Sequence, residues 1–120
     1  MSLALYYEAK REKPLTALEK AACDEIINRY STQYPFKKMY HDFGVFIVEE
    51  TDIVFSGSTK LPMSNPQFMY DVANYWLKCL TEVTKLLEKC LWTVTFEDVD
   101  LILDENEGWR FPTDEEYSQR

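Results

Sequence analysis

One stretch, from Asn65 to Cys90, constrains the fold more than any other part of the chain. Its apolar residues recur in steps of three and four, which is the spacing of one face of an α-helix. These residues are Met69, Val72, Ala73, Trp76, Leu80, Val83, Leu87 and Cys90. Asn65 is a good N-cap, and Pro66 follows at the first helical position, where a missing N–H costs nothing. The stretch predicts a long amphipathic helix whose apolar arc is wide enough for a sheet beneath it and a second helix beside it.

The part of the chain before this helix predicts a strand followed by a shorter helix. Residues 3–9 form the strand candidate. Thr16 and Glu19 match a capping box, in which each of the two side chains accepts a hydrogen bond from the backbone of the other residue. The helix is expected to run to about Tyr30 and to end before Pro35, because the residue that precedes a proline disfavours helical backbone.

Further strands are expected on both sides of the central helix. The candidates are residues 44–50, 53–56, 91–96, 99–103 and 109–111, the last as a short strand or a packed arm. The first two are close enough to form an antiparallel hairpin through a turn at Thr51 and Asp52. Gly57 and Ser58 are expected to end the second of them or to form a bulge.

The order of these elements predicts the fold class. Strand, helix, strand, strand, helix, strand is the ferredoxin-like βαββαβ arrangement, an α+β fold with an antiparallel sheet and two helices on one face. A C-terminal strand or hairpin would extend it. The alternative is another α+β sandwich in which the C-terminal hairpin extends the sheet. Residues 1–111 are expected to form a single α+β domain, and residues 112–120 an acidic, frayed tail.

The composition limits the compartment. There is no apolar run of about 18 residues that would indicate a membrane span, and the N-terminus does not resemble a secretion signal. Cys79 and Cys90 would lie about 16 Å apart on the predicted helix, too far for a disulfide. With Cys23 they are expected to be buried free thiols, so the predicted location is the cytoplasm.

The net charge of −8 is concentrated at the C-terminus, where residues 97–120 hold nine acidic residues against Arg110 and Arg120. This surplus of −7 argues against nucleic acid as a partner. It suits a basic protein partner, although acidic surfaces also serve solubility. The residues predicted to form the interaction surface are Asp98, Asp100, Asp104, Glu105, Glu107 and Trp109.

A second candidate interface is the face of the sheet that the two helices leave uncovered. Tyr6, Phe46, Val48 and Val54 are candidates for this face. An exposed apolar patch of more than a few hundred Å² is typical of an interface. The sequence therefore favours a homodimer.

Candidate catalytic and metal sites are sparse. The single histidine, His41, lies beside Asp42, which could orient it as a general base. Neighbouring residues on a strand point to opposite faces, however. No pattern of cysteines or histidines predicts zinc, and Asp104, Asn106 and Gly108 match a calcium loop only weakly. Glycine-rich phosphate-binding motifs are absent. The sequence predicts neither a metal nor a cofactor.

We therefore expect a small, acidic, non-enzymatic interaction module whose partner is a basic protein or a second copy of the chain. An immunity-type inhibitor of a basic toxin would be one example. The alternative is a small-ligand-binding protein or an enzyme with an aromatic pocket between sheet and helices. Its lining would be Tyr75, Trp76, Trp92, Phe55 and His41.

Overall fold

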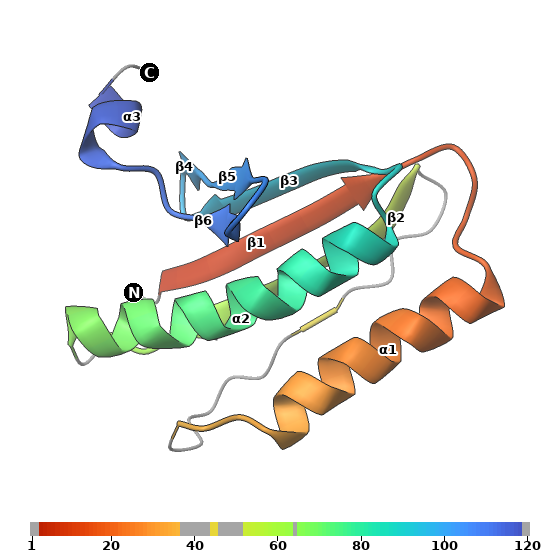
Figure 1. Cartoon of the computed structure of the whole chain (residues 1–120), viewed down its shortest axis with the longest axis horizontal. Helices are drawn as coiled ribbons and strands as arrows, with labels where there is room; N and C mark the ends of the chain where they lie inside the picture. The colour runs from red at the N-terminus through yellow and green to blue at the C-terminus, as the bar shows by residue number, and fades with distance from the viewer. Residues whose placement is uncertain (1–2, 37–43, 46–51, 64, 119–120) are drawn as a thin grey trace.

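The structure is a computed structural model that describes residues 3–36, 44–45, 52–63 and 65–118 (Figure 1). Strands and helices are mixed along the chain, and every strand pair among these residues is antiparallel, so the fold is α+β. In chain order the elements are β1 (Leu3–Lys10), α1 (Ala17–Thr32), β2 (Ile53–Leu61), α2 (Pro66–Leu86), β3 (Leu91–Phe96), β4 (Val99–Asp100), β5 (Ile102–Asp104), β6 (Gly108–Arg110) and α3 (Asp114–Ser118).

The main sheet has the strand order β2-β1-β3-β4, and β5 and β6 form a separate two-stranded hairpin. In β1, Leu5, Tyr7 and Ala9 are buried on the face that carries the helices. Tyr7 lies opposite Gly57 of β2 and Val94 of β3. Alternation of the strands therefore directs one face of the sheet into the core.

The ferredoxin-like order requires a further strand beside β2, where the sequence predicts residues 44–50. Residues 46–51 lie outside the described residues, so this order stays a prediction. At its start, the amide of Gly44 donates to the carbonyl of Ser58 at 3.1 Å. At the opposite edge of the sheet, β4 pairs with β3 through Thr95 and Phe96.

The predicted end of a strand at Gly57 is wrong, because β2 continues to Leu61. Glycine at this position allows close packing and does not end the strand. A Cβ at Gly57 would lie 1.9 Å from the carbonyl oxygen of Gly44 and 2.6 Å from the ring of Tyr7. The hydroxyl of Tyr7 donates to that same carbonyl at 2.6 Å, so the missing side chain makes room for this contact.

The two long helices begin as the sequence predicts. The side chain of Asn65 accepts from the amide of Phe68, with Pro66 at the start of α2. Thr16 and Glu19 form the capping box of α1. The predicted end of α2 at Cys90 is wrong, because the helix stops at Leu86 and residues 87–90 form a turn.

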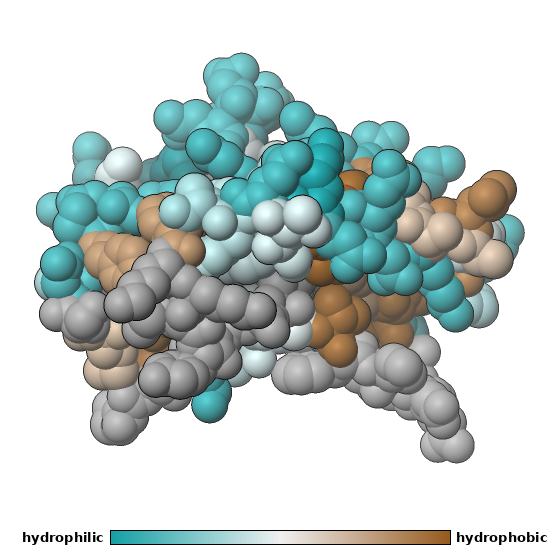
Figure 2. All heavy atoms as spheres, turned by 90° about the horizontal axis from the view of Figure 1, so that it is seen from below, coloured by the Kyte–Doolittle hydropathy of each residue, from teal (hydrophilic) through white to brown (hydrophobic). Residues whose placement is uncertain are grey.

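The core lies between the sheet and α2, and α1 packs beside α2 (Figure 1). Trp76 of α2 is only 2% exposed. Within α1, Cys23 is the fully buried residue, and Ile26, Ile27 and Tyr30 are half-buried against the core. Figure 2 views the molecule from the α1 side and shows a largely hydrophilic surface with hydrophobic residues towards both ends. This surface fits a helix that contributes one flank to the core.

The reverse face of the sheet is more polar than expected. Tyr6 is 46% exposed there and lies opposite Ser58 and Thr95 in the neighbouring strands. Val54 is half-buried, and Phe46 and Val48 are not among the described residues. In the described part of this face, serine, threonine and charged residues surround Tyr6. This part of the face therefore does not form a continuous apolar patch.

The predicted free thiols are confirmed, because Cys23, Cys79 and Cys90 are all buried and unpaired with one another. Burial raises the pKa of Cys23 to about 11 and that of Cys79 to about 12. Both thiols therefore stay protonated at neutral pH. Among the helices of the described residues, none has the length and apolar character to cross a membrane.

Candidate functional site

The residues predicted to line an aromatic pocket fall into two groups. Tyr75 and Trp76 of α2 pack with rings from α1 and the segment after it. Tyr34 stacks on Trp76 at 5.6 Å between ring centroids, and Tyr30 meets Tyr75 edge-on at 5.3 Å. These contacts, with Trp76 buried, form a packed aromatic cluster among the described residues.

The second group lies on the sheet. Phe55 of β2 and Trp92 of β3 pack with their ring centroids 5.7 Å apart. His41 lies outside the described residues. Of the predicted set, Trp92 also lines the wall of an open cleft at the end of α2.

This cleft has a volume of about 560 Å³ and lies between the last turns of α2, β3 and the β5–β6 hairpin. Volumes of about 300–1,000 Å³ are typical of ligand sites. From α2 and the turn after it come Thr81, Thr84, Lys85, Glu88 and Cys90. From β3 and the C-terminal segment come Trp92, Leu101, Leu103, Asp104, Glu105 and Trp109. The cleft therefore combines an apolar wall with charged groups.

Two threonines of α2 hold the hairpin in place. The amide of Trp109 donates to the hydroxyl oxygen of Thr81 at 3.0 Å, and its indole Nε1 donates to that of Thr84 at 2.8 Å. Gly108 precedes this contact with a φ of 78°, and a Cβ there would lie 2.4 Å from the Thr81 hydroxyl. Only glycine combines this backbone conformation with this close approach.

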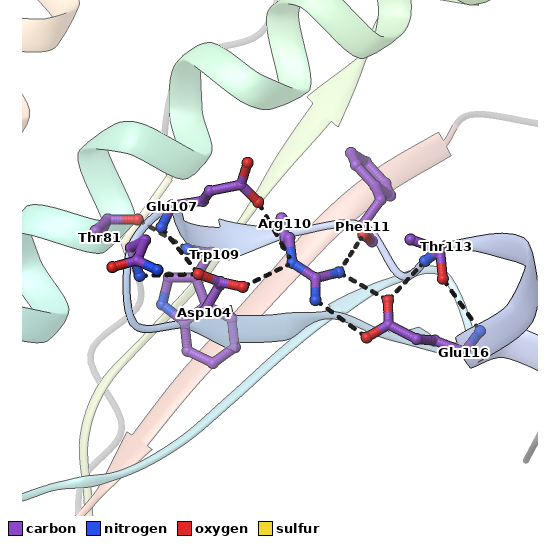
Figure 3. Close-up of polar contacts among 9 residues, drawn as sticks. Thr81, Asp104, Glu107, Trp109, Arg110, Phe111, Thr113 and Glu116 are labelled. Carbon is purple, nitrogen blue, oxygen red and sulfur yellow. Dashed lines mark hydrogen bonds and ion pairs between the residues drawn. The ribbon is translucent and has the colours of Figure 1, made fainter.

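A network around Arg110 stabilises the hairpin and the start of α3 (Figure 3). Asp104 accepts from the amides of Asn106 and Glu107 at 2.8 and 3.1 Å, which closes the hairpin turn. Arg110 pairs with Asp104 at 3.3 Å and, through two nitrogens, with Glu116 at 2.8 and 3.0 Å. The backbone donors, followed by Arg110, hold the pKa of Asp104 below its usual value. The charge of Asp104 is thus compensated within the molecule.

Arg110 also holds the C-terminal segment in place. Its pairing with Glu116 lowers the pKa of Glu116 to about 2, and Thr113 forms a capping box with the same glutamate. The segment after Pro112, for which the sequence predicts a frayed tail, therefore contains the helical turn α3.

The other two carboxylates of the cleft are differently placed. Glu88 and Glu105 are exposed, and neither forms an ion pair or side-chain hydrogen bond within the described part of the chain. Glu88 directly follows Leu87, the C-cap of α2, and the helix dipole contributes partial negative charge at this end of the helix. Lys85 is the cation among the lining residues. The rim is therefore negative on balance.

The predicted interaction residues are dispersed over this end of the molecule. Asp98 and Asp100 are exposed in and beside the turn between β3 and β4. Glu105 and Glu107 are exposed at the hairpin tip. Trp109 is only 7% exposed and packs against α2, so its ring belongs to the interior.

The sequence interpretation missed part of this site, namely Thr81, Thr84, Lys85, Glu88, Cys90, Leu101, Leu103 and Gly108. The one local signal was the pair Thr81 and Thr84, two hydroxyls on successive turns of the long helix. Threonine is common on the solvent side of a helix, so this pair alone does not predict a contact.

The groups in the cleft do not form a nucleophile with a base. Burial raises the pKa of Cys90, against the opposing effect of Arg11, so its thiol stays protonated. The described residues contain no group of histidine, cysteine, aspartate and glutamate side chains arranged to hold a metal ion. The cleft is thus suited to binding through apolar contact and charge. Comparisons with protein-family models, curated proteins and solved structures found no match to this chain.

Proposed function

We propose that this protein is a non-enzymatic interaction module that binds a basic protein partner through its acidic C-terminal surface. The supporting observation is the pair of uncompensated carboxylates, Glu88 and Glu105, at the rim of an apolar cleft. Exposed carboxylates of this kind attract a cationic surface and accelerate its association. An immunity-type inhibitor of a basic toxin is one form that such a module takes.

The surrounding charge supports the same partner. Residues 97–120 carry a net charge of −7, and Asp98 and Asp100 lie on the same C-terminal segment. Arg110, the cation of the described part of this segment, is occupied by Asp104 and Glu116. A basic partner would therefore meet few competing cations here.

A small-molecule ligand is the second candidate. The volume of the cleft and the presence of Trp92 in its wall favour this alternative. The two proposals differ in size of partner and in salt dependence. An isolated small ligand would be bound mainly by the apolar wall, whereas binding of a basic protein should weaken steeply as salt screens the rim.

Two further proposals concern the assembly. We retain the ferredoxin-like strand order, with residues 44–50 as the edge strand, supported by the Gly44–Ser58 hydrogen bond beside β2. The cytoplasmic location stays a proposal, supported by the three buried free thiols. The homodimer also stays a proposal, and the described part of the reverse face does not form the apolar patch on which it was predicted. Sedimentation equilibrium over a range of concentrations tests the dimer, and a monomer at high concentration would contradict it.

Charge reversal tests the main proposal. The variant Glu88→Lys/Glu105→Lys changes the rim of the cleft, and Glu12→Lys/Glu25→Lys makes the same change in net charge at exposed positions on and near α1. The probe is an array of lysine- and arginine-rich peptides, with the affinity of each hit measured by fluorescence anisotropy at low and high salt. We expect the rim variant to weaken binding by about tenfold and the control by less than about twofold. A peptide affinity that changes neither with salt concentration nor in the rim variant would contradict the proposal.

A further inference from the structure

We infer that the cleft between α2 and the β5–β6 hairpin receives a single lysine or arginine side chain of the partner, flanked by an apolar residue. This inference rests on the proposed function and names the chemistry of the partner's recognition segment. Three properties of the cleft indicate this chemistry: the apolar surface of its walls, the hydrogen-bonding groups that are already engaged within the molecule, and the negative charge at its rim.

The wall offers apolar contact. Leu101 is buried beneath the cleft, and Leu103 lines it with 49% of its surface exposed. The indole Nε1 of Trp92 already donates to the carbonyl of Leu87 at 3.1 Å, and that of Trp109 donates to Thr84. Both tryptophans therefore use their polar atom inside the molecule and present only carbon to an occupant. An aliphatic stem suits such a wall.

The threonine hydroxyls are also engaged. Thr81 donates to the carbonyl of Leu77 at 2.7 Å and accepts from the Trp109 amide. Thr84 accepts from the Trp109 indole. The acceptors that remain accessible are the carboxylates of Glu88 and Glu105, which require a hydrogen-bond donor in the occupant.

The potential at the rim favours a cation. The C-terminal end of α2 lies beside Glu88. The partial negative charge of the helix dipole at this end adds to the charge of the Glu88 carboxylate. Lys85 opposes it with one positive charge, against Glu88 and Glu105 together. A carboxylate or phosphate would meet two uncompensated like charges. An ammonium or guanidinium group on an aliphatic stem satisfies both the wall and the rim.

The neighbouring residue of the occupant is argued from the size of the cleft. A volume of about 560 Å³ exceeds what one side chain fills, and exposed Leu103 extends the apolar surface towards the hairpin tip. A residue next to the cation is thus expected to rest on Leu103. This places a short cationic and apolar segment of the partner across the cleft.

Short blocked peptides test the inference. They carry leucine–X–leucine at their centre, with arginine, lysine, norleucine or glutamate at X, and binding is followed by anisotropy and by tryptophan fluorescence. We expect the arginine and lysine peptides to bind at least about tenfold more tightly than the other two. Glu88→Gln/Glu105→Gln should weaken both by about tenfold, whereas the control Glu12→Gln/Glu25→Gln should stay within about twofold. Leu103→Ser, at a half-exposed position, should weaken binding without changing the urea midpoint.

The outcomes separate this inference from the proposed function. If basic peptides bind with salt dependence, but Asp98→Asn/Asp100→Asn weakens them and the Glu88/Glu105 variant does not, the cleft is not the anchor and the function stands. If none of the basic peptides binds at low salt, both fail. If blocked arginine alone binds as tightly as the peptide, the cleft is a small-molecule site and the inference is overturned. Circular dichroism of each variant verifies its fold.

Discussion

The two flanks of α2 are closed in different ways. On the α1 side, rings from three segments meet at centroid distances of 5.3–5.6 Å, as in the Tyr30–Tyr75 and Tyr34–Trp76 pairs. On the hairpin side, the ring of Trp109 is held by two threonines, and Phe111, just after β6, meets Tyr70 of α2 edge-on at 5.1 Å. Rings against rings fill space, whereas short hydroxyl side chains hold a partner at hydrogen-bond distance and leave a cleft. The comparison teaches that the two flanks of one helix can be packed by different kinds of contact, aromatic on one side and polar on the other.

The polar contacts of the two flanks differ as well. Between α1 and α2, Glu82 accepts hydrogen bonds from Tyr30 and Arg29. Burial opposes the charge of Glu82, but these two donors hold its pKa below the usual value. On the hairpin side, Glu88 and Glu105 have no such partners among the described residues. Charge is therefore neutralised at the closed flank and left accessible at the open one.

The largest effect is expected from removing the main ring of each flank. Trp76→Ala and Trp109→Ala should each lower the free energy of unfolding by about 3–5 kcal/mol in urea titrations, because each deletes a buried indole. Hydrogen exchange should distinguish them. Trp76→Ala should expose amides of α1 and α2, and Trp109→Ala mainly those of β5 and β6. Equal exchange throughout the chain in both variants would contradict the comparison.

A smaller effect is expected at the contact between hairpin and helix. Gly108→Ala should cost roughly 2–4 kcal/mol, the sum of a strained positive φ and a clash with Thr81. The matched control is Asn106→Ala at the exposed hairpin tip, which should change the free energy of unfolding by less than about 0.5 kcal/mol. Similar urea midpoints for the two variants would show that the close approach at Gly108 does not stabilise the hairpin.

Thr84→Val tests one hydrogen bond of the open flank. It removes the acceptor of the Trp109 indole and leaves a buried N–H unsatisfied, at an expected cost of about 1–3 kcal/mol. Thr84→Ser keeps the hydroxyl and should recover most of that loss. The measurement is the free energy of unfolding, with tryptophan fluorescence as a local probe. A valine variant as stable as the unchanged protein would show that the hydrogen bond from the Trp109 indole does not stabilise this flank.

The smallest effect concerns acid stability. The pKa of Glu116 is lowered from 4.5 to about 2 by Arg110 and Thr113, so its contribution to stability is present above about pH 4.5 and lost as the pH falls towards 2. Glu116→Gln should flatten this part of the pH dependence of unfolding. The matched control is Glu19 at the start of α1, whose pKa is likewise lowered to about 2 by Arg11 and Thr16. An unchanged pH profile in Glu116→Gln would show that α3 does not depend on this ion pair.

Local signals predicted much of the helical layer. The N-cap at Asn65 and the capping box at Thr16 each involve residues within one turn, so the sequence contains all of the interacting groups. The sequence predicts that α2 ends at Cys90, whereas the helix ends earlier, at Leu86. Leu87 caps the helix, and its carbonyl accepts hydrogen bonds from the amide of Cys90 and from the Trp92 indole. The apolar residues Leu87 and Cys90, which continue the helical spacing, therefore lie in the turn after the helix, and Cys90 lines the cleft.

The candidate site was only partly predictable. The acidic residues of the C-terminal segment were recognised as a surface, because an excess of charge is visible in any window of sequence. Which of them are compensated depends on Arg110, and which of them border a cleft depends on where the hairpin docks. Trp109 was expected in an interaction surface, and it is buried because Thr81 and Thr84 lie within hydrogen-bond reach of it.

The sequence by itself determined the α+β class, the long amphipathic helix, the free thiols and the acidic C-terminus, because these follow from periodicity, capping and composition over short distances. The tertiary structure decided the rest. It placed a polar surface on the described reverse face of the sheet, closed one flank of α2 with aromatic rings and left a cleft at the other. Each of these features requires residues 25 or more positions apart to meet, as Trp109 meets Thr84, and such pairings depend on the packing of whole elements.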